Sequence, residues 1–392
     1  MRILMLNYEY PPLGGGGGVL NRDLAEALSQ EHAITLLTSR YDGLPAREVC
    51  GGVEIVRVPV WGRHDPQVAS LRSMLSFFPS SLGYGWRLLR RQRVDVVHSL
   101  FAVPSAPSGF LLARHFGVPH LLSILGGDIY DPSKRLSPHR HALLRALVRH
   151  LLRASDAVVG MSTDIIAHAQ SRYGITRDIV KIPHGIRRPV YSRTCREALG
   201  YRAQELLLVT VGRLVPRKAT HELLDVVARL HGVAFKLLII GDGPEKSRLQ
   251  QQAAQQGLGD RVAFLGSVSD EVKFQVLSVA DIYVSTTQHE GFGLMFLEAM
   301  ACGLPIVSYD HGGHVDFLID GKTGFLVRLG DRALFAHRLQ ELCDHAPLRR
   351  EMGQFNRAYV EEFYIERCAQ KYSALYRALA ASRGPGKEGG EP

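Results

Sequence analysis

The sequence predicts an α/β protein of two domains, each built around a parallel sheet. At 392 residues the chain is longer than a single hydrophobic core usually supports. Apolar segments of strand length alternate with helical patterns along both halves, which is typical of parallel βαβ units. Hydrophobic residues make up 46% and charged residues 22% of the chain, an ordinary composition for globular domains.

The first domain is expected to cover residues 1–186. Helical patterns at Leu20–Gln30 and Ser108–Phe116 lie between its apolar segments. The predicted strands of this half are Ile3–Asn7, Ala33–Thr38, Glu54–Val60, Val94–Leu100, His120–Leu125, Ala157–Met161 and Val180–Pro183. The segment from His184 to Pro189 contains glycine and proline, so we place the domain boundary there.

The second domain is expected to cover residues 187–363. Its strand–helix series begins with the apolar segments Leu206–Val211 and Phe235–Ile240 and continues to about Val327. A last helix is predicted over Ile365–Ala381, in a separate segment of residues 364–383. Residues 384–392 are rich in glycine, proline and glutamate, and we expect a disordered tail there.

Glu290 and Glu298 lie eight positions apart in a segment that opens a helix. The segment follows the predicted strand Ala280–Ser285 and leads into an apolar helix at Leu294–Cys302, which Gly303 and a proline end. A helix N-terminus preceded by glycines exposes backbone N–H groups to an anion. Two carboxylates beside such a site suit a ligand with phosphate and hydroxyl groups, such as a nucleotide sugar. The alternative is that both glutamates only cap and solvate the helix.

A second candidate anion site follows the predicted strand Leu206–Val211. Gly212, Arg213 and Lys218 lie in the loop after this strand, and open α/β sheets bind ligands at the carboxyl ends of their strands. Two cations there can neutralise a diphosphate and stabilise it as a leaving group. Alone, such a loop is ordinary exposed surface charge, but together with the Glu290 segment it favours a binding site.

Together these segments resemble the retaining glycosyltransferases of the GT-B type, in the large family 4 that includes bacterial mannosyltransferases, sucrose synthases and cell-wall enzymes. The spaced glutamates of that family match Glu290 and Glu298, and its Gly-Arg…Lys loop matches Gly212, Arg213 and Lys218. The similarity extends over nearly the whole chain. Further matching segments are the opening loop Tyr10–Gly15, the turn Gly241–Pro244, the base-side loop Phe264–Val268 and the late hairpin-like segment Asp320–Val327.

The resemblance implies two Rossmann-like domains that face a central cleft, with the C-terminal helix crossing back to the first domain. It also implies transfer of a sugar, with retention of configuration, from a UDP-, GDP- or ADP-sugar to a glycan or lipid-linked acceptor of the cell envelope. Arg213 and Lys218 would meet the charge of the diphosphate in place of a metal. No metal and no cofactor are therefore expected.

The resemblance also assigns roles around the donor. Glu290 would contact the transferred sugar, Glu298 the ribose, and the backbone N–H groups of Gly293 and Leu294 the phosphate. Gly243 and Val268 would lie near the base. The remaining donor-binding residues that it implies are Gly212, Gly291 and Phe292.

The glycine run Gly14–Gly18 has two interpretations. In a nicotinamide-cofactor fingerprint the first glycine follows the strand almost at once, but here Tyr8–Leu13 intervenes and includes two prolines. We therefore favour a mobile loop that closes over the donor diphosphate through Gly15, Gly16 and Gly17. The next helix would then begin at Val19.

Asp128 is the catalytic candidate of the first domain. It follows the predicted strand His120–Leu125 after two glycines, at a strand end that can face a ligand. Many relatives place a histidine in this neighbourhood, so a contact with the sugar or acceptor is carried over to Asp128 by position. The alternative is an aspartate that caps a turn or a helix.

Residues 139–153 predict an amphipathic helix in which Arg145, Arg149 and Arg153 border an apolar face. With a formal net charge of +9, this helix is a candidate for binding an anionic membrane surface. The alternative is that its apolar face packs on the first domain. No nucleic-acid partner is expected, because no aromatic–basic interleaving or binding module is present.

The remaining features favour a cytoplasmic protein, peripheral on the inner face of the membrane if the 139–153 helix binds lipid. The five cysteines have no metal-binding spacing, and Met1–Asn7 is a strand pattern rather than a signal peptide. Other functions compatible with the pattern are a nucleotide-sugar epimerase, a phosphorylase that uses free phosphate, and an inactive nucleotide-sugar-binding protein.

Overall fold

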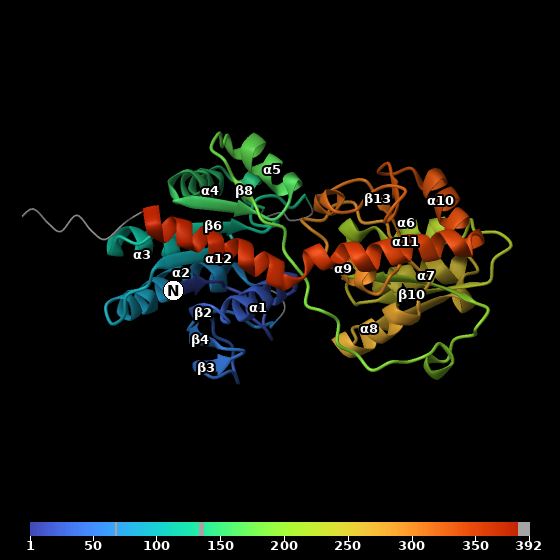
Figure 1. Ribbon diagram of the computed structural model, residues 1–392, viewed down its shortest axis with the longest axis horizontal. Coiled ribbons are helices and arrows are strands. Elements are labelled where there is room, and N and C mark those ends of the chain that lie inside the picture. Colours follow the sequence, from blue (N-terminus) through green and yellow to red (C-terminus); the bar gives the residue numbers. More distant parts are fainter. Residues whose placement is uncertain (67–68, 133–136, 383–392) are drawn as a thin grey trace, which may run out of the picture. The chain divides into compact units, whose positions relative to one another are not determined.

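The computed structural model describes residues 1–66, 69–132 and 137–382 of the chain (Figure 1). The chain divides into two compact units. One contains Met1–Gly185 and the described residues from Ile365 to Ser382, and the other contains Ile186–Tyr364. The predicted tail at 384–392 lies outside the described residues.

The first unit contains a sheet whose strands are β1 (Arg2–Leu6), β2 (Ala33–Ser39), β3 (Arg47–Cys50), β4 (Val53–Val58), β5 (Val96–Leu100), β6 (His120–Ile124), β7 (Ala157–Gly160) and β8 (Val180–Lys181). Their order across the sheet is β3-β4-β2-β1-β5-β6-β7-β8. All neighbouring strands are parallel except β3, which runs antiparallel to β4. Strands β5 and β6 are buried along their whole length, and each combines apolar residues with one histidine and one serine.

The helices of the first unit are α1 (Gly16–Leu28), α2 (Leu71–Leu89), α3 (Ala106–Phe116), α4 (Ala142–Ala154), α5 (Thr163–Tyr173) and α12 (Ile365–Ser382). Helices α1 and α12 pack against each other, and α2 packs against α3 (Figure 1). None of the helices in the described part of the chain is long and apolar enough to cross a bilayer.

Polar contacts buried in the first unit join α12 to the sheet. His98 of β5 hydrogen-bonds through Nδ1 to the Tyr376 hydroxyl at 2.7 Å, and the Ser123 and Tyr372 hydroxyls lie 2.9 Å apart. His98 is fully buried, and desolvation lowers the pKa of its imidazole to about 3. The ring is therefore neutral at physiological pH, and it fixes α12 by direct hydrogen bonds rather than by charge.

The second unit contains a sheet whose strands are β9 (Leu206–Val211), β10 (Phe235–Ile240), β11 (Val262–Gly266), β12 (Ile282–Ser285), β13 (Ile306–Tyr309) and β14 (Gly324–Val327). Their order is β11-β10-β9-β12-β13-β14, and the pairs are all parallel. The helices are α6 (Thr220–Val227), α7 (Lys246–Gln255), α8 (Asp270–Val279), α9 (Leu294–Ala301), α10 (Arg332–Asp344) and α11 (Ala346–Tyr359). The two units are thus Rossmann-like parallel sheets with helices.

Several local expectations differ from the structure. Helix α1 begins at Gly16 rather than Val19, so part of the glycine run is helical instead of forming a loop. Strand β3 and helix α2 were not expected. The segment Asp320–Val327 is not hairpin-like, because β14 pairs parallel to β13 after the turn at Gly321.

Candidate functional site

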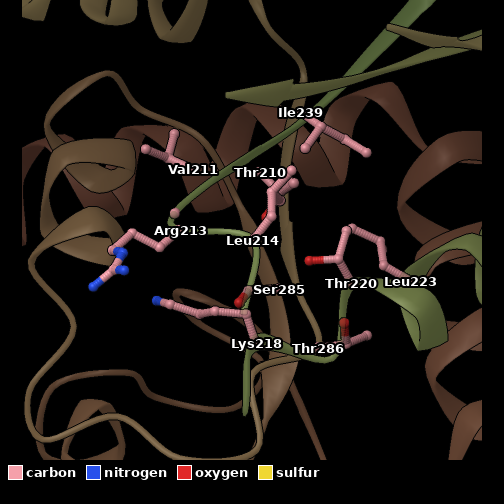
Figure 2. A pocket seen from close by; sticks show the side chains of 11 residues that line it. Thr210, Val211, Arg213, Leu214, Lys218, Thr220, Leu223, Ile239, Ser285 and Thr286 are labelled. Carbon is pink, nitrogen blue, oxygen red and sulfur yellow. The ribbon is translucent and has the colours of Figure 1, made fainter. Parts of the chain in front are cut away.

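The carboxyl ends of β9 and β12 mark the point where the second sheet reverses its direction of winding. The chain leaves β9 toward β10 on one side, and β12 lies on the other side of β9 and leads toward β13. The loops after the two strands therefore diverge and leave a crevice, which is where doubly wound sheets bind ligands. A small pocket at this edge is lined by Thr210, Arg213, Lys218, Ser285 and Thr286, among others (Figure 2).

Lys218 and Glu290 form an ion pair across this crevice. Lys218 ends the short 3-10 helix Pro216–Lys218 after β9, and Glu290 lies in the loop between β12 and α9. The Nζ of Lys218 contacts Oε1 of Glu290, and both side chains are about nine-tenths buried. The structure therefore brings these two predicted residues together, although Lys218 is not exposed as the sequence had suggested.

The electrostatics of this pair keep Glu290 ionised. Burial alone would raise the pKa of Glu290, but the positive charges of Lys218 and Arg217 outweigh it and lower the pKa to about 2. Burial also lowers the pKa of Lys218, which Glu290 partly opposes. At neutral pH the crevice thus holds the buried, ionised carboxylate of Glu290, and the positive charges of Lys218 and Arg217 compensate it.

Three donors converge on a single oxygen of Glu290. Oε1 accepts from Lys218, from Arg217 Nη1 at 3.3 Å and from the Thr287 hydroxyl at 3.2 Å. Oε2 has no hydrogen bond to any of the residues that the structure describes. The carboxylate is thus fixed through one oxygen, and the other remains able to accept a hydrogen bond.

Arg217 was not among the residues singled out from the sequence. Besides Glu290, its Nη1 donates to the His289 carbonyl at 2.9 Å, and the Arg217 carbonyl accepts from the Gln288 N–H at 2.9 Å. Arg217 therefore joins the loop after β9 to the loop after β12 through both its backbone and its side chain. The sequence signal was its position next to Lys218 in a basic loop.

Arg213 differs from its neighbours because its side chain has no hydrogen bond or ion pair with any described residue. Figure 2 shows the Arg213 and Lys218 side chains extending to the same side of the pocket. Since a free guanidinium attracts anions and presents two parallel N–H donors, Arg213 is the uncompensated cation of this crevice.

The turn at Gly241–Gly243 packs closely against the loop after β9. A Cβ on Gly241 would lie 2.0 Å from the Gly212 carbonyl oxygen, and one on Gly243 would lie 2.4 Å from the Leu214 oxygen. Only glycine allows two backbones to approach so closely. The predicted donor residues Gly212 and Gly243 thus have a packing role that fixes the course of the Arg213 loop.

The N-terminus of α9 has backbone donors without an acceptor in the described part of the chain. Among the described residues, no acceptor is found for the N–H groups of Gly293 and Leu294. Gly293 has a φ of +92°, and a Cβ there would lie 2.6 Å from Phe296. Phe292 is buried with its ring 5.1 Å from that of Phe317, so its side chain belongs to the core and only its backbone can face a ligand.

Glu298 of α9 pairs with a lysine that the sequence analysis did not identify. Lys273 of α8 lies 2.7 Å from Glu298 Oε1 and 3.0 Å from Asp270. Burial by itself would lower the pKa of Lys273, but the two carboxylates outweigh it and raise the pKa. Both partners are mostly buried, so Glu298 is held in one orientation by a charged partner.

Ala219 is the N-cap of α6 and has a left-handed backbone, with φ of +46° and ψ of +37°. This conformation is unfavourable for an alanine. It turns the Ala219 carbonyl toward the Thr286 hydroxyl, which donates to it at 2.9 Å. Strained residues of this kind cluster at functional sites, and here the strain lies directly after Lys218.

In the first unit, Asp128 is enclosed by backbone donors. It is 4% exposed, and its carboxylate accepts from the N–H groups of Ala102, Leu125 and Gly126 at 2.7–3.1 Å. This arrangement supports the turn-capping interpretation: Asp128 fixes the loops after β5 and β6. A contact of this carboxylate with a substrate would have to share oxygens that already accept backbone hydrogen bonds.

The glycine run lies at the switch point of the first sheet, after β1 and beside β5. A Cβ on Gly15 or Gly16 would meet no atom within 4 Å, whereas one on Gly17 would lie 2.5 Å from the Phe101 ring. Gly15 and Gly16 therefore border open space at the start of α1, and Gly17 is needed for packing. Phe101 itself has a φ of +71°, a second strained residue at a strand end.

Helix α4 covers most of the predicted 139–153 helix. Val148, Leu151 and Leu152 are buried, which agrees with packing of its apolar face on the first unit. Arg149 donates to the Tyr173 carbonyl at 2.7 Å and Arg153 to the Gly174 carbonyl at 3.0 Å. Two of its three arginines therefore cap the end of α5.

The described residues contain no group of three or more His, Cys, Asp or Glu side chains arranged to hold a metal ion. Of the cysteines, Cys302, Cys343 and Cys368 are buried and Cys50 and Cys195 are exposed, and all are free thiols.

Comparison with known proteins agrees with this geometry. The sequence model of the family described as Glycosyl transferases group 1 matches residues 192–359, and that of Glycosyltransferase Family 4 matches residues 14–188. The chain is 28% identical over 385 residues, 94% of each protein, to the N-acetyl-alpha-D-glucosaminyl L-malate synthase of Bacillus anthracis.

Solved structures share the fold. Sucrose-phosphate synthase from Thermosynechococcus elongatus matches with a TM-score of 0.81 and 22% identity, over 97% of this chain and 100% of that one. Anabaena HepE in complex with UDP and glucose matches with a TM-score of 0.75 and 19% identity, over 96% and 100%. Both comparisons assign the two sheets to the GT-B architecture.

Proposed function

Because this chain belongs to the family 4 type of the group 1 glycosyltransferases, we propose that it transfers a sugar from a nucleotide diphosphate sugar to an acceptor hydroxyl with retention of anomeric configuration. The observation that carries the proposal is the crevice of the second unit. There an uncompensated Arg213, a buried Lys218–Glu290 pair and the free N–H groups of α9 lie at one sheet edge.

The diphosphate is the part of the donor that this edge suits best. Arg213 offers a free guanidinium, and Lys218 offers the protons that it does not share with Glu290. As the glycosidic bond breaks, negative charge develops on the departing nucleoside diphosphate, and fixed cations stabilise that charge. The N–H groups of Gly293 and Leu294 add the positive end of a helix dipole. Transfer would then need neither a metal nor a cofactor.

Glu290 would bind the transferred sugar rather than move a proton. With a pKa of about 2, its carboxylate is too weak a base to take a proton efficiently near neutral pH. Its free Oε2 can accept a hydrogen bond from a sugar hydroxyl while Oε1 stays bound to Lys218 and Arg217. The same carboxylate would thus connect the sugar to the cation that meets the leaving group.

The rest of the donor would lie along the same sheet edge. Glu298, oriented by Lys273, would accept from the ribose hydroxyls. The base would lie near Gly243 and Val268.

For the acceptor we propose a glycan or lipid-linked hydroxyl of the cell envelope, presented at the cytoplasmic face of the membrane. A small hydroxy acid is a second candidate, because the Bacillus anthracis relative is named for L-malate. Asp128 would act on this side only indirectly, by fixing the loops after β5 and β6.

The test is a panel of radiolabelled UDP-, GDP- and ADP-sugars incubated with the protein in excess EDTA. Each sugar is offered with water, with L-malate or with a membrane extract. We expect the wild-type protein to transfer the sugar of one donor or to hydrolyse that donor slowly. The Arg213→Ala variant should lose this activity. An epimerised but intact nucleotide sugar, or turnover only with free phosphate, would instead identify an epimerase or a phosphorylase. Activity that EDTA removes and magnesium restores would contradict the metal-free mechanism.

A further inference from the structure

Helix α2 presents an apolar stripe to solvent along most of its length. Apolar residues recur on it every three or four positions, the spacing that places side chains on one side of a helix. Leu71 is 55% exposed, Leu75 65%, and Phe78 and Trp86 36% each. Leu82, between the last two, is half-buried. An apolar row of this length with several exposed members marks an interaction surface rather than ordinary scatter.

Packing within the first unit accounts for only part of this stripe. Leu82 packs against the core of the unit, and the Trp86 ring lies 4.0 Å from that of His115 and 5.2 Å from that of Phe116 of α3. Helix α2 buries a different side, through Ser73, Phe77, Ser81, Gly85 and Leu88. On that side α2 approaches α3 so closely that a Cβ on Gly85 would lie 2.4 Å from Leu112 (Figure 1). The other members of the stripe, Leu71, Leu75 and Phe78, are therefore additional to the contacts that anchor α2 in the unit.

The charged residues of the stretch that contains α2 all have one sign. Between Asp65 and Asp95 the sequence contains no aspartate or glutamate. The arginines of this stretch, all exposed, are Arg72, Arg87, Arg90, Arg91 and Arg93. The helix thus combines an apolar row with neighbouring positive charge, and nothing within the stretch neutralises that charge.

Both tryptophans of the chain lie at this surface. Trp86 is part of the stripe, and its ring lies 4.0 Å from that of His115 of α3. Trp61 is 77% exposed, and its backbone N–H donates to the Ser76 hydroxyl of α2 at 2.9 Å. Tryptophan is enriched at membrane–water interfaces, because its ring is apolar and its N–H is polar.

We propose that α2 docks the protein on an anionic lipid bilayer, with the stripe in the boundary between headgroups and acyl chains and the arginines over the headgroups. The charge favours this occupant over a second copy of the chain. Two copies facing each other through α2 would bring ten arginines together without a single acidic residue from either stretch. Helix α4 is less suited to lipid, because Arg149 and Arg153 already bind the end of α5.

Intrinsic tryptophan fluorescence tests this proposal without a label, since Trp61 and Trp86 are the two tryptophans. The protein is titrated with vesicles of phosphatidylcholine, alone or with about one third phosphatidylglycerol. A blue shift with the anionic vesicles, weakened by salt, is expected. Leu75→Ser with Phe78→Ser should lower the partition coefficient at least tenfold. Arg87→Gln with Arg90→Gln should lower it by roughly fivefold per charge removed.

The matched control is Leu143→Ser with Arg145→Gln on the exposed side of α4, which should change binding less than twofold. Circular dichroism and thermal melts establish that each variant is folded. Binding that is equal in all variants, no blue shift for the folded wild type, or a doubled mass that the α2 variants abolish would each overturn the proposal. Because no donor or acceptor is used, the outcome is independent of the proposed catalytic activity.

Discussion

Arg213 and Lys218 follow the same strand, yet replacing each by alanine should have different effects on stability. The Arg213 side chain has no partner among the described residues, so its loss leaves no group unpaired. Lys218 is largely buried against Glu290, and its loss leaves a buried carboxylate with only part of its compensation. Both substitutions should slow transfer, but only Lys218→Ala should also weaken the fold.

The magnitudes follow from these contacts. Removing one fixed cation that meets developing negative charge lowers kcat by about 10²–10³-fold, so each single variant should fall in that range. For stability, Arg213→Ala should stay within about 0.5 kcal/mol of wild type, as for other exposed substitutions. Lys218→Ala should cost about 3 kcal/mol, the lower end for a broken buried pair, because Arg217 and Thr287 still donate to Glu290.

The measurements are initial rates with the donor found in the panel, and urea unfolding of the same preparations. Arg229→Ala, an exposed arginine of the same unit, controls for the loss of one surface charge. Adding Glu290→Gln to Lys218→Ala should restore much of the lost stability but none of the activity, since it removes the uncompensated charge. A rate loss under about tenfold for Arg213→Ala, or an unchanged unfolding free energy for Lys218→Ala, would refute the reasoning.

Three further outcomes are expected. Glu298→Gln should mainly raise the KM for the donor, because a ribose contact is equal in ground and transition states, whereas Glu290→Gln should mainly lower kcat; equal effects of both variants on both constants would contradict this division. Ala219→Gly should raise the unfolding free energy by about 1 kcal/mol, since glycine adopts a positive φ without strain, and a loss of stability in urea unfolding would count against it. Because the pKa of His98 is lowered to about 3, folding stability should be fully present above pH 6.5 and fall toward pH 3 by up to ~1.4 kcal/mol per pH unit. His98→Gln should flatten this fall in pH-dependent unfolding, and an unchanged slope would show that other groups cause it.

The buried strands were predictable because a parallel strand covered on both faces is a short, almost continuous apolar run. Strand β3 was missed because it lies at the sheet edge and is mostly exposed. The available signal was Gly51-Gly52, which joins β3 to β4 with φ of +56° and +79°, the two-residue turn that closes hairpins. Helix α2 was missed because Pro79 lies inside it, and a proline within a helical pattern usually ends the helix.

The site was harder to predict because it depends on strand order. The sequence places Lys218 after one strand and Glu290 after another, 72 residues apart, but only the sheet shows that β9 and β12 are neighbours. Strand ends alone could not distinguish Asp128 from a ligand-binding residue, because its backbone donors come from two separate loops. Likewise, nothing in the local sequence around Lys273 indicated that it would meet Glu298.

Helix α12 has a consequence for the way the chain folds during synthesis. Its inner side, including Tyr372 and Tyr376, completes the core of the unit that begins at Met1, while the whole of Ile186–Tyr364 is synthesised in between. Domains generally fold as units, the N-terminal one first, as the chain leaves the ribosome. Here the second unit is complete in sequence while the first still lacks its last helix, with its sites for Tyr372 and Tyr376 on β5 and β6 unfilled. The unit whose translation begins first is therefore the unit whose core is completed last.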